Sequence, residues 1–211
     1  MATSSRQLIL DSIRAATHND SSIYADLPRN YIHRGALDKA SRLQLMTERL
    51  REYGAEVAES SLADLATTIA RQLQSSGRHI FVAPPSLPAE WLASNFVWKV
   101  DHALSHDEIE QCDGVVTAAF AGIADSGTIV LHHSPTEGRR VLTLLPDFHL
   151  CILRASQIVE TLPEYFDRCP QPPRLATYIS GPSATADIEM TRIKGVHGPR
   201  FLSLILVRDD I

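Results

Sequence analysis

Short, almost wholly apolar runs bounded by turn residues constrain the fold of this chain more than any other feature. They cover residues 79–83, 149–153 and 201–207, and each lies close to a glycine or proline. Such runs are too short for buried helices and are typical of strands that are covered on both faces. Stretches with helical spacing of apolar residues, at 37–53 and 62–73, separate them. The alternation predicts an α/β fold with a Rossmann-like three-layer body.

The later part of the chain repeats this alternation. We expect residues 156–166 to form a helix capped by Ser156. The last three strands, near 149–153, 176–179 and 201–207, are then separated by helices, which predicts parallel pairing through βαβ connections. Another pattern, Ser105 to Glu108, has the spacing of a capping box and predicts the start of a short helix.

The chain has room for one main domain. Its 211 residues fit a single core with an added segment at one end. Residues 6–16 have the apolar spacing of a short amphipathic helix, and a polar stretch follows them. We therefore expect residues 1–36 to form an N-terminal helical extension and residues 37–211 to form the domain itself.

Composition excludes several classes of partner. The net charge of −5 offers no basic surface for nucleic acid, and no apolar run is long enough to span a bilayer. Residues 1–15 lack the pattern of a signal peptide. The three cysteines, Cys112, Cys151 and Cys169, are scattered and form no Cys-x-x-Cys pair, so we expect neither disulfides nor a metal site. A cytoplasmic protein with no membrane or nucleic-acid partner is expected.

Residues 180–199 predict a strand end, a glycine turn, a helix and a glycine stop at Gly195. Gly181 permits a sharp turn, and Ser183 or Thr185 can cap the first N–H groups of the helix. Because a helix N-terminus attracts anions, this segment is a candidate phosphate or carboxylate site. The alternative is that both hydroxyls serve only as caps.

The densest β pattern lies at residues 114–134, interrupted by Asp125, Ser126 and Gly127. A carboxylate in a turn at the end of a buried strand can act as a base, so Asp125 is the candidate catalytic residue, with Ser126 and Gly127 beside a ligand. The alternative is that these three residues only form a turn and bind no ligand, because an aspartate side chain can hydrogen-bond to nearby backbone and glycine readily adopts a positive φ.

Two further places hold candidate ligand-binding residues. Arg139 and Arg140 follow the loop at residues 134–138 and can supply a cation, although loop arginines are often only solvated. His197 precedes the last strand and is either a cleft residue or a hydrogen-bonded structural histidine. Three other histidines, His132, His133 and His149, invite a metal interpretation, which is rejected because the adjacent His132 and His133 point to opposite faces of a strand and cannot easily share an ion.

Three blocks of sequence together resemble one family. They are GIADSGTIVL at residues 122–131, LLPDFH at 144–149, and ISGPSATADIE at 179–189 followed by GVHGP at 195–199. In order and spacing these blocks resemble the LUD-domain proteins, specifically the lactate utilization protein C branch. The resemblance covers about residues 37–207.

The resemblance implies a fold similar to the group containing ribose-5-phosphate isomerase, glucosamine-6-phosphate deaminase and CoA transferases. It also implies a role in oxidising L-lactate to pyruvate beside two iron–sulfur partner proteins, of the A and B types. Two positions depart from the family pattern. Asp125 and Ser126 stand where members commonly have Glu and Thr, and Ala184 stands where members have a basic residue.

The sequence leaves three functions open. The first is a component of an L-lactate oxidising system whose electrons are carried by partners, because the chain has no cysteine cluster and no Gly-x-Gly-x-x-Gly motif and thus no expected cofactor. The second is an isomerase or acyl transferase that uses Asp125 as base or nucleophile. The third is a non-catalytic sensor of a small anionic metabolite, either a sugar phosphate or a carboxylate.

Overall fold

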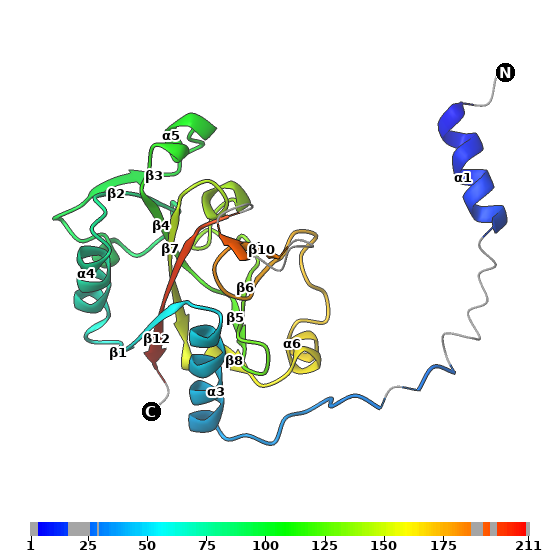
Figure 1. Ribbon diagram of the computed structural model, residues 1–211, viewed down its shortest axis with the longest axis horizontal. Coiled ribbons are helices and arrows are strands. Elements are labelled where there is room, and N and C mark those ends of the chain that lie inside the picture. Colours follow the sequence, from blue (N-terminus) through cyan, green and yellow to red (C-terminus); the bar gives the residue numbers. More distant parts are fainter. Residues whose placement is uncertain (1–3, 17–25, 29, 187–191, 195–197, 210–211) are drawn as a thin grey trace. The chain divides into compact units, whose positions relative to one another are not determined.

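The three apolar runs form strands of one sheet of six parallel strands in the computed structural model (Figure 1). The structure describes residues 4–16, 26–28, 30–186, 192–194 and 198–209. Across the sheet the strands follow the order β1-β12-β7-β4-β2-β3. In that order they are β1 (Glu56–Ser61), β12 (Phe201–Arg208), β7 (Phe148–Arg154), β4 (Gly114–Ala118), β2 (Ile80–Ala83) and β3 (Val97–Val100).

The central strands are buried on both faces, as their unbroken apolar sequence predicts. In β7, Leu150 and Ile152 belong to the core on one face, and Cys151 and Leu153 belong to the core on the other. Successive side chains of a strand point to opposite faces, so one strand serves two cores.

Helix α4 (Leu65–Ser75) and the 3₁₀ turn η1 (Ala89–Trp91) cover one face of this sheet. Leu65, Ile69 and Leu73, spaced at four residues, turn their side chains into this core. Phe81 of β2 lies at its centre and meets the ring of Phe96 edge to face at 5.4 Å.

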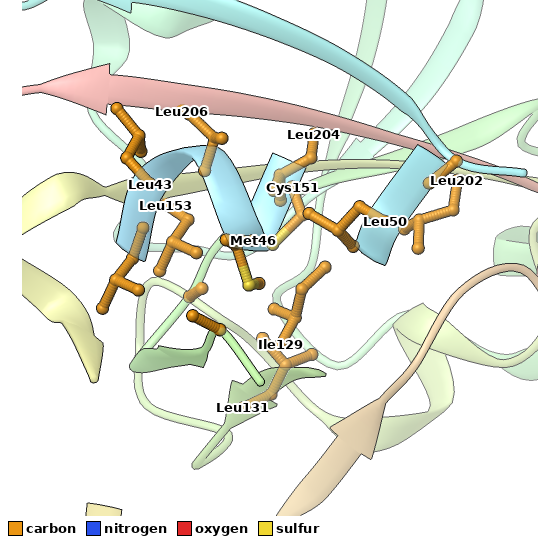
Figure 2. Close-up of a cluster of buried hydrophobic side chains, with 14 residues drawn as sticks. Leu43, Met46, Leu50, Ile129, Leu131, Cys151, Leu153, Leu202, Leu204 and Leu206 are labelled. Carbon is orange, nitrogen blue, oxygen red and sulfur yellow. The ribbon is translucent and has the colours of Figure 1, made fainter. Parts of the chain in front are cut away.

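Helix α3 (Lys39–Glu52) and a second sheet cover the opposite face. Figure 2 shows Leu43, Met46 and Leu50 of α3 directed towards the strand side chains around Cys151. Asp38 begins the helix, since its side chain accepts a hydrogen bond from the Ser41 N–H at 2.7 Å.

The second sheet has four strands in the order β8-β5-β6-β9, and a separate hairpin joins β10 to β11. The sheet is mixed, because β6 is antiparallel to both of its neighbours whereas β8 runs parallel to β5. The strands are β5 (Ala121–Ile123), β6 (Thr128–Leu131), β8 (Ile158–Val159), β9 (Thr177–Ile179), β10 (Ala184–Ala186) and β11 (Arg192–Lys194).

The remaining elements are short. They are α1 (Ser5–Ala16), α5 (His106–Glu110), η2 (Arg140–Thr143), η3 (Ala155–Gln157) and α6 (Leu162–Arg168). The chain divides into two compact units, Met1–Tyr31, which contains α1, and Ile32–Ile211, which contains both sheets. Among the helices that the structure describes, none has the length and apolar character that crossing a lipid bilayer requires.

Several local predictions are confirmed. The α/β class holds, α3 ends before Gly54, and the predicted capping box forms at the start of α5 between Ser105 and Glu108. The turn at Asp125 also forms, with Gly127 at a φ of +59° and its N–H bonded to the Ala124 carbonyl at 3.2 Å.

The helix predicted after Gly181 is wrong. Residues 184–186 form β10 and pair antiparallel with β11 at residues 192–194, while residues 187–191 lie outside the described residues. Ser183 and Thr185 therefore do not cap a helix, and the expectation that a helix N-terminus attracts an anion here no longer applies. An isolated helix shorter than about 12–15 residues is marginal in water, and pairing across a hairpin overrides it.

Two predictions for the preceding segment are also wrong. No helix begins at Ser156; its hydroxyl donates to Asp209 at 2.6 Å, and α6 begins later, capped by Thr161. The β-branched pair Ile158 and Val159 instead joins β5 as a strand. The last three strands do not all pair in parallel: β7 and β12 do, but β9 pairs antiparallel with β6 in the second sheet.

Candidate functional site

The turn after β9 closes a cavity over the amino ends of β7 and β12. Gly181 has a φ of +87°, and a Cβ added to it would lie 2.5 Å from Cβ of Tyr53, just past the end of α3. Only glycine allows this turn to pack so closely on the helix end. Residues 180–183 thereby form one wall of a cavity of about 310 Å³.

The other walls come from three parts of the fold. Thr143 and Leu144 enter from η2 and the residue after it, His149 from β7, and Leu202 from β12. Gly181 and Ser183, two of the candidate ligand-binding residues, both line the cavity. Ser183 is held there by a backbone hydrogen bond from its N–H to the Pro199 carbonyl at 2.9 Å.

The two predicted arginines separate. Arg139 binds Asp101 through two hydrogen bonds, at 2.8 Å from Nε and 2.7 Å from Nη2, and donates a third to the Leu104 carbonyl. The Arg139 guanidinium lowers the pKa of the buried Asp101 carboxyl. Arg140 lines the cavity and has no acidic partner among the described residues. Of these two arginines, Arg140 is therefore the one that can offer its positive charge to a ligand in the cavity.

His149 lies at the floor of the cavity and is 1% exposed. Its Nε2 lies 2.8 Å from the hydroxyl of Thr117, and its Nδ1 has no hydrogen-bond partner in the described part of the chain. Burial lowers the pKa of the imidazole to about 4, so the ring is neutral at neutral pH. A buried neutral ring with one free nitrogen is equipped to hydrogen-bond a ligand.

Asp125 and Ser126 line a neighbouring cavity of about 290 Å³, which shares Tyr178 and Ser180 with the first. A chain of hydroxyls connects the two regions: Thr128 lies 2.7 Å from Ser126 and 2.7 Å from Ser180, oxygen to oxygen. The Asp125 and Gly181 turns are therefore adjacent in the fold, although they are far apart in sequence.

The backbone around Asp125 has a structural role. The Asp125 N–H donates to Glu160 at 2.9 Å, and its carbonyl accepts from Nε of Arg49 at 3.2 Å. A Cβ on Gly127 would lie 2.6 Å from Cβ of Arg49, so this glycine permits the close packing of the turn on α3. The carboxylate of Asp125 is exposed at the edge of its cavity.

The side chains of two predicted site residues lie outside the described part of the structure. Thr185 lies in β10 by its backbone, and its side chain is outside the description. His197 lies outside the described residues. Neither residue contributes to the geometry that follows.

A third cavity, of about 250 Å³, lies at the carboxyl ends of β4 and β7, where ligands of open α/β sheets usually bind. Its buried carboxylate, Glu137, accepts hydrogen bonds from the His132 N–H and the Ser134 hydroxyl, so both oxygens are engaged. Within the described residues, no three His, Cys, Asp or Glu side chains gather as a metal cluster.

Comparison with known proteins places the chain in a family. A family model described as LUD domain matches residues 43–207, which is more than half of the chain. The chain belongs to the LUD-domain family. This LUD-domain protein is 39% identical over 175 residues to Lactate utilization protein C of Deinococcus radiodurans, a match covering 81% of this chain and 82% of that protein.

Other relatives match a shorter part of the LUD-domain protein. Lactate utilization protein C of Bacillus subtilis is 37% identical over 123 residues, covering 54% of this chain and 51% of that protein. The fold is also similar to the crystal structure of a DUF162 family protein from Deinococcus radiodurans, with a TM-score of 0.68 and 34% identity. That match covers 82% of this chain and 99% of the other chain.

The sequence did not predict that His149 of this LUD-domain protein lines the cavity. The histidine was considered only as a metal ligand, yet it stands inside an apolar run whose strand is buried on both faces. A polar side chain in such a strand needs a partner, and that requirement was a usable signal. Thr117 comes from a distant segment, so only the fold shows that it contacts this ring, and that Arg140 lines the same cavity.

Proposed function

We propose that this LUD-domain protein acts in lactate utilization, as a cytoplasmic component of a system that oxidises L-lactate to pyruvate together with iron–sulfur partner proteins of the A and B types. The observation that carries the proposal is the 39% identity over 81% of the chain to a protein named Lactate utilization protein C. The B. subtilis relative carries the same name.

The division of labour follows from the residues that the chain does offer. Cys112 and Cys151 are buried in two different hydrophobic clusters, and burial raises the pKa of the Cys151 thiol to about 12. Such thiols behave as small apolar core residues. In the proposed system the electrons pass to the partner proteins, and this chain contributes a binding site for a small anionic metabolite.

Deleting the encoding gene tests the proposal. The deletant should fail to grow on L-lactate as sole carbon source, should grow on pyruvate, and should recover when the gene is supplied on a plasmid. Growth on pyruvate is the matched control, because it enters metabolism after the proposed step. Normal growth of the deletant on L-lactate would refute the proposed role.

The cavity beside Asp125 favours one alternative function. Its exposed carboxylate and the nearby Ser126 hydroxyl suit an isomerase or acyl transferase in which Asp125 is the base or nucleophile, or a non-catalytic sensor of a sugar phosphate. A thermal-shift screen with sugar phosphates tests it, because a ligand of the folded state raises the melting temperature. A raised melting temperature that Asp125→Asn abolishes would support this alternative over the first proposal.

A further inference from the structure

Two unlike groups line the cavity over the amino ends of β7 and β12. The Arg140 guanidinium is exposed and has no acidic partner among the described residues, whereas His149 is 1% exposed and neutral. A guanidinium suits a carboxylate, which it can bind through two parallel hydrogen bonds. A neutral imidazole nitrogen suits an uncharged oxygen or a hydroxyl.

From this pairing we propose that the cavity binds a small monocarboxylate with an oxygen on C2, that is, a 2-hydroxy or 2-oxo acid. The carboxylate pairs with Arg140, and the C2 oxygen meets Nδ1 of His149. The assignment to lactate and pyruvate rests on the proposed function, while the chemical class rests on the two side chains.

The hydrogen bond to Thr117 explains how one site accepts both acids. When the Thr117 hydroxyl donates to Nε2, the ring proton is on Nδ1, which can donate to the keto oxygen of a 2-oxo acid. When Nε2–H donates instead, the hydroxyl turns towards Sγ of Cys151, 3.8 Å away, and Nδ1 accepts from a 2-hydroxyl. The neutral ring therefore matches either oxidation state by a change of tautomer.

Charge favours a monoanion over a sugar phosphate. Among the described residues that line the cavity, Arg140 is the one Lys or Arg side chain, which balances a single negative charge. Leu144, Ile179 and Leu202 supply apolar wall. A cavity of about 310 Å³ is at the small end of ligand sites, and the single cation and apolar walls suit a three-carbon acid.

Calorimetric titration of the purified chain with pyruvate, L-lactate and propionate tests the assignment. Propionate carries the carboxylate but no C2 oxygen. We expect pyruvate and L-lactate to bind about tenfold more tightly than propionate, the worth of one buried hydrogen bond. Arg140→Gln should weaken all three acids by at least about tenfold. Arg71→Gln, on α4 at the opposite face of the sheet, is the matched control and should bind as the parent does.

A pair of His149 variants separates ligand contact from packing. The amide of Gln reaches the position of Nε2 and can keep the bond to Thr117, whereas the amide of Asn reaches the position of Nδ1. We expect His149→Gln to bind pyruvate no better than propionate, and His149→Asn to keep most of the preference. If His149 has only a structural role, His149→Gln should keep the preference for pyruvate at least as well as His149→Asn does.

Three outcomes overturn the site: equal affinity of the parent for pyruvate and propionate, an unchanged dissociation constant in Arg140→Gln, or no binding of any of the acids. The growth test and the binding test can fail independently of each other. A deletant that grows normally on L-lactate, with selective binding intact, refutes the role in lactate utilization and leaves the site standing. Loss of growth without binding refutes the site alone.

Discussion

The burial of His149 makes the stability of the protein depend on pH. The pKa of this imidazole falls from 6.5 to about 4 on folding, because burial disfavours its charged form. Between these values the unfolded chain binds the proton and the folded chain does not. The contribution of His149 is therefore fully present above about pH 6.5 and is lost as the pH falls towards 4.

The size of the effect follows from the two pKa values. Lowering the pH from about 7 to about 5 shifts the folding equilibrium towards the unfolded chain by a factor of roughly twenty, which removes about 2 kcal/mol of stability. The effect is large for a single group, since whole domains are stable by about 5–15 kcal/mol.

Urea denaturation at about pH 7 and about pH 5 measures this loss of stability. The parent should lose about 2 kcal/mol more than His149→Gln between the two conditions, whatever the cost of the substitution at pH 7. His106→Gln removes an exposed histidine at the start of α5 and is the matched control, whose curve should run parallel to that of the parent. If His149→Gln also runs parallel to the parent, the buried neutral histidine is refuted.

Three further substitutions test the frame around the site. Gly181→Ala should lower the free energy of unfolding by at least about 1 kcal/mol more than Gly54→Ala does. Both glycines have φ near +85°, but only at Gly181 would the added Cβ lie within 4 Å of a neighbour. Equal losses in urea denaturation would refute the packing argument. Arg139→Gln should cost on the order of 2 kcal/mol by leaving buried Asp101 without its ion pair, and an unchanged urea midpoint would contradict this. Asp125→Asn should keep the melting temperature within error, because the turn is held by backbone groups; a large drop would show that the carboxylate itself holds the turn.

The sequence predicted the elements better than their partners. The apolar runs at β2, β7 and β12 were recognisable because strands buried on both faces contain few polar residues. The segment after Gly181 was not, because its strand β10 is specified by pairing with β11 across the hairpin rather than by local preference.

The site was predictable in part for the same reason. The glycine turns at Gly127 and Gly181 were visible as turn chemistry, although their close packing on α3 was not. The two adjacent arginines are alike in sequence, and only the position of Asp101 on a separate loop decides that Arg139 is engaged and Arg140 is left for the cavity. The contact between His149 and Thr117 joins residues 32 positions apart, so the sequence alone could not predict it.

A crystal structure of the protein soaked with pyruvate tests the central claim most directly. We predict density for the acid in the cavity over the amino ends of β7 and β12, with its carboxylate against the Arg140 guanidinium and its keto oxygen within hydrogen-bond distance of Nδ1 of His149. Density for pyruvate beside Asp125, or in the carboxyl-end cavity beside Glu137, would contradict the account.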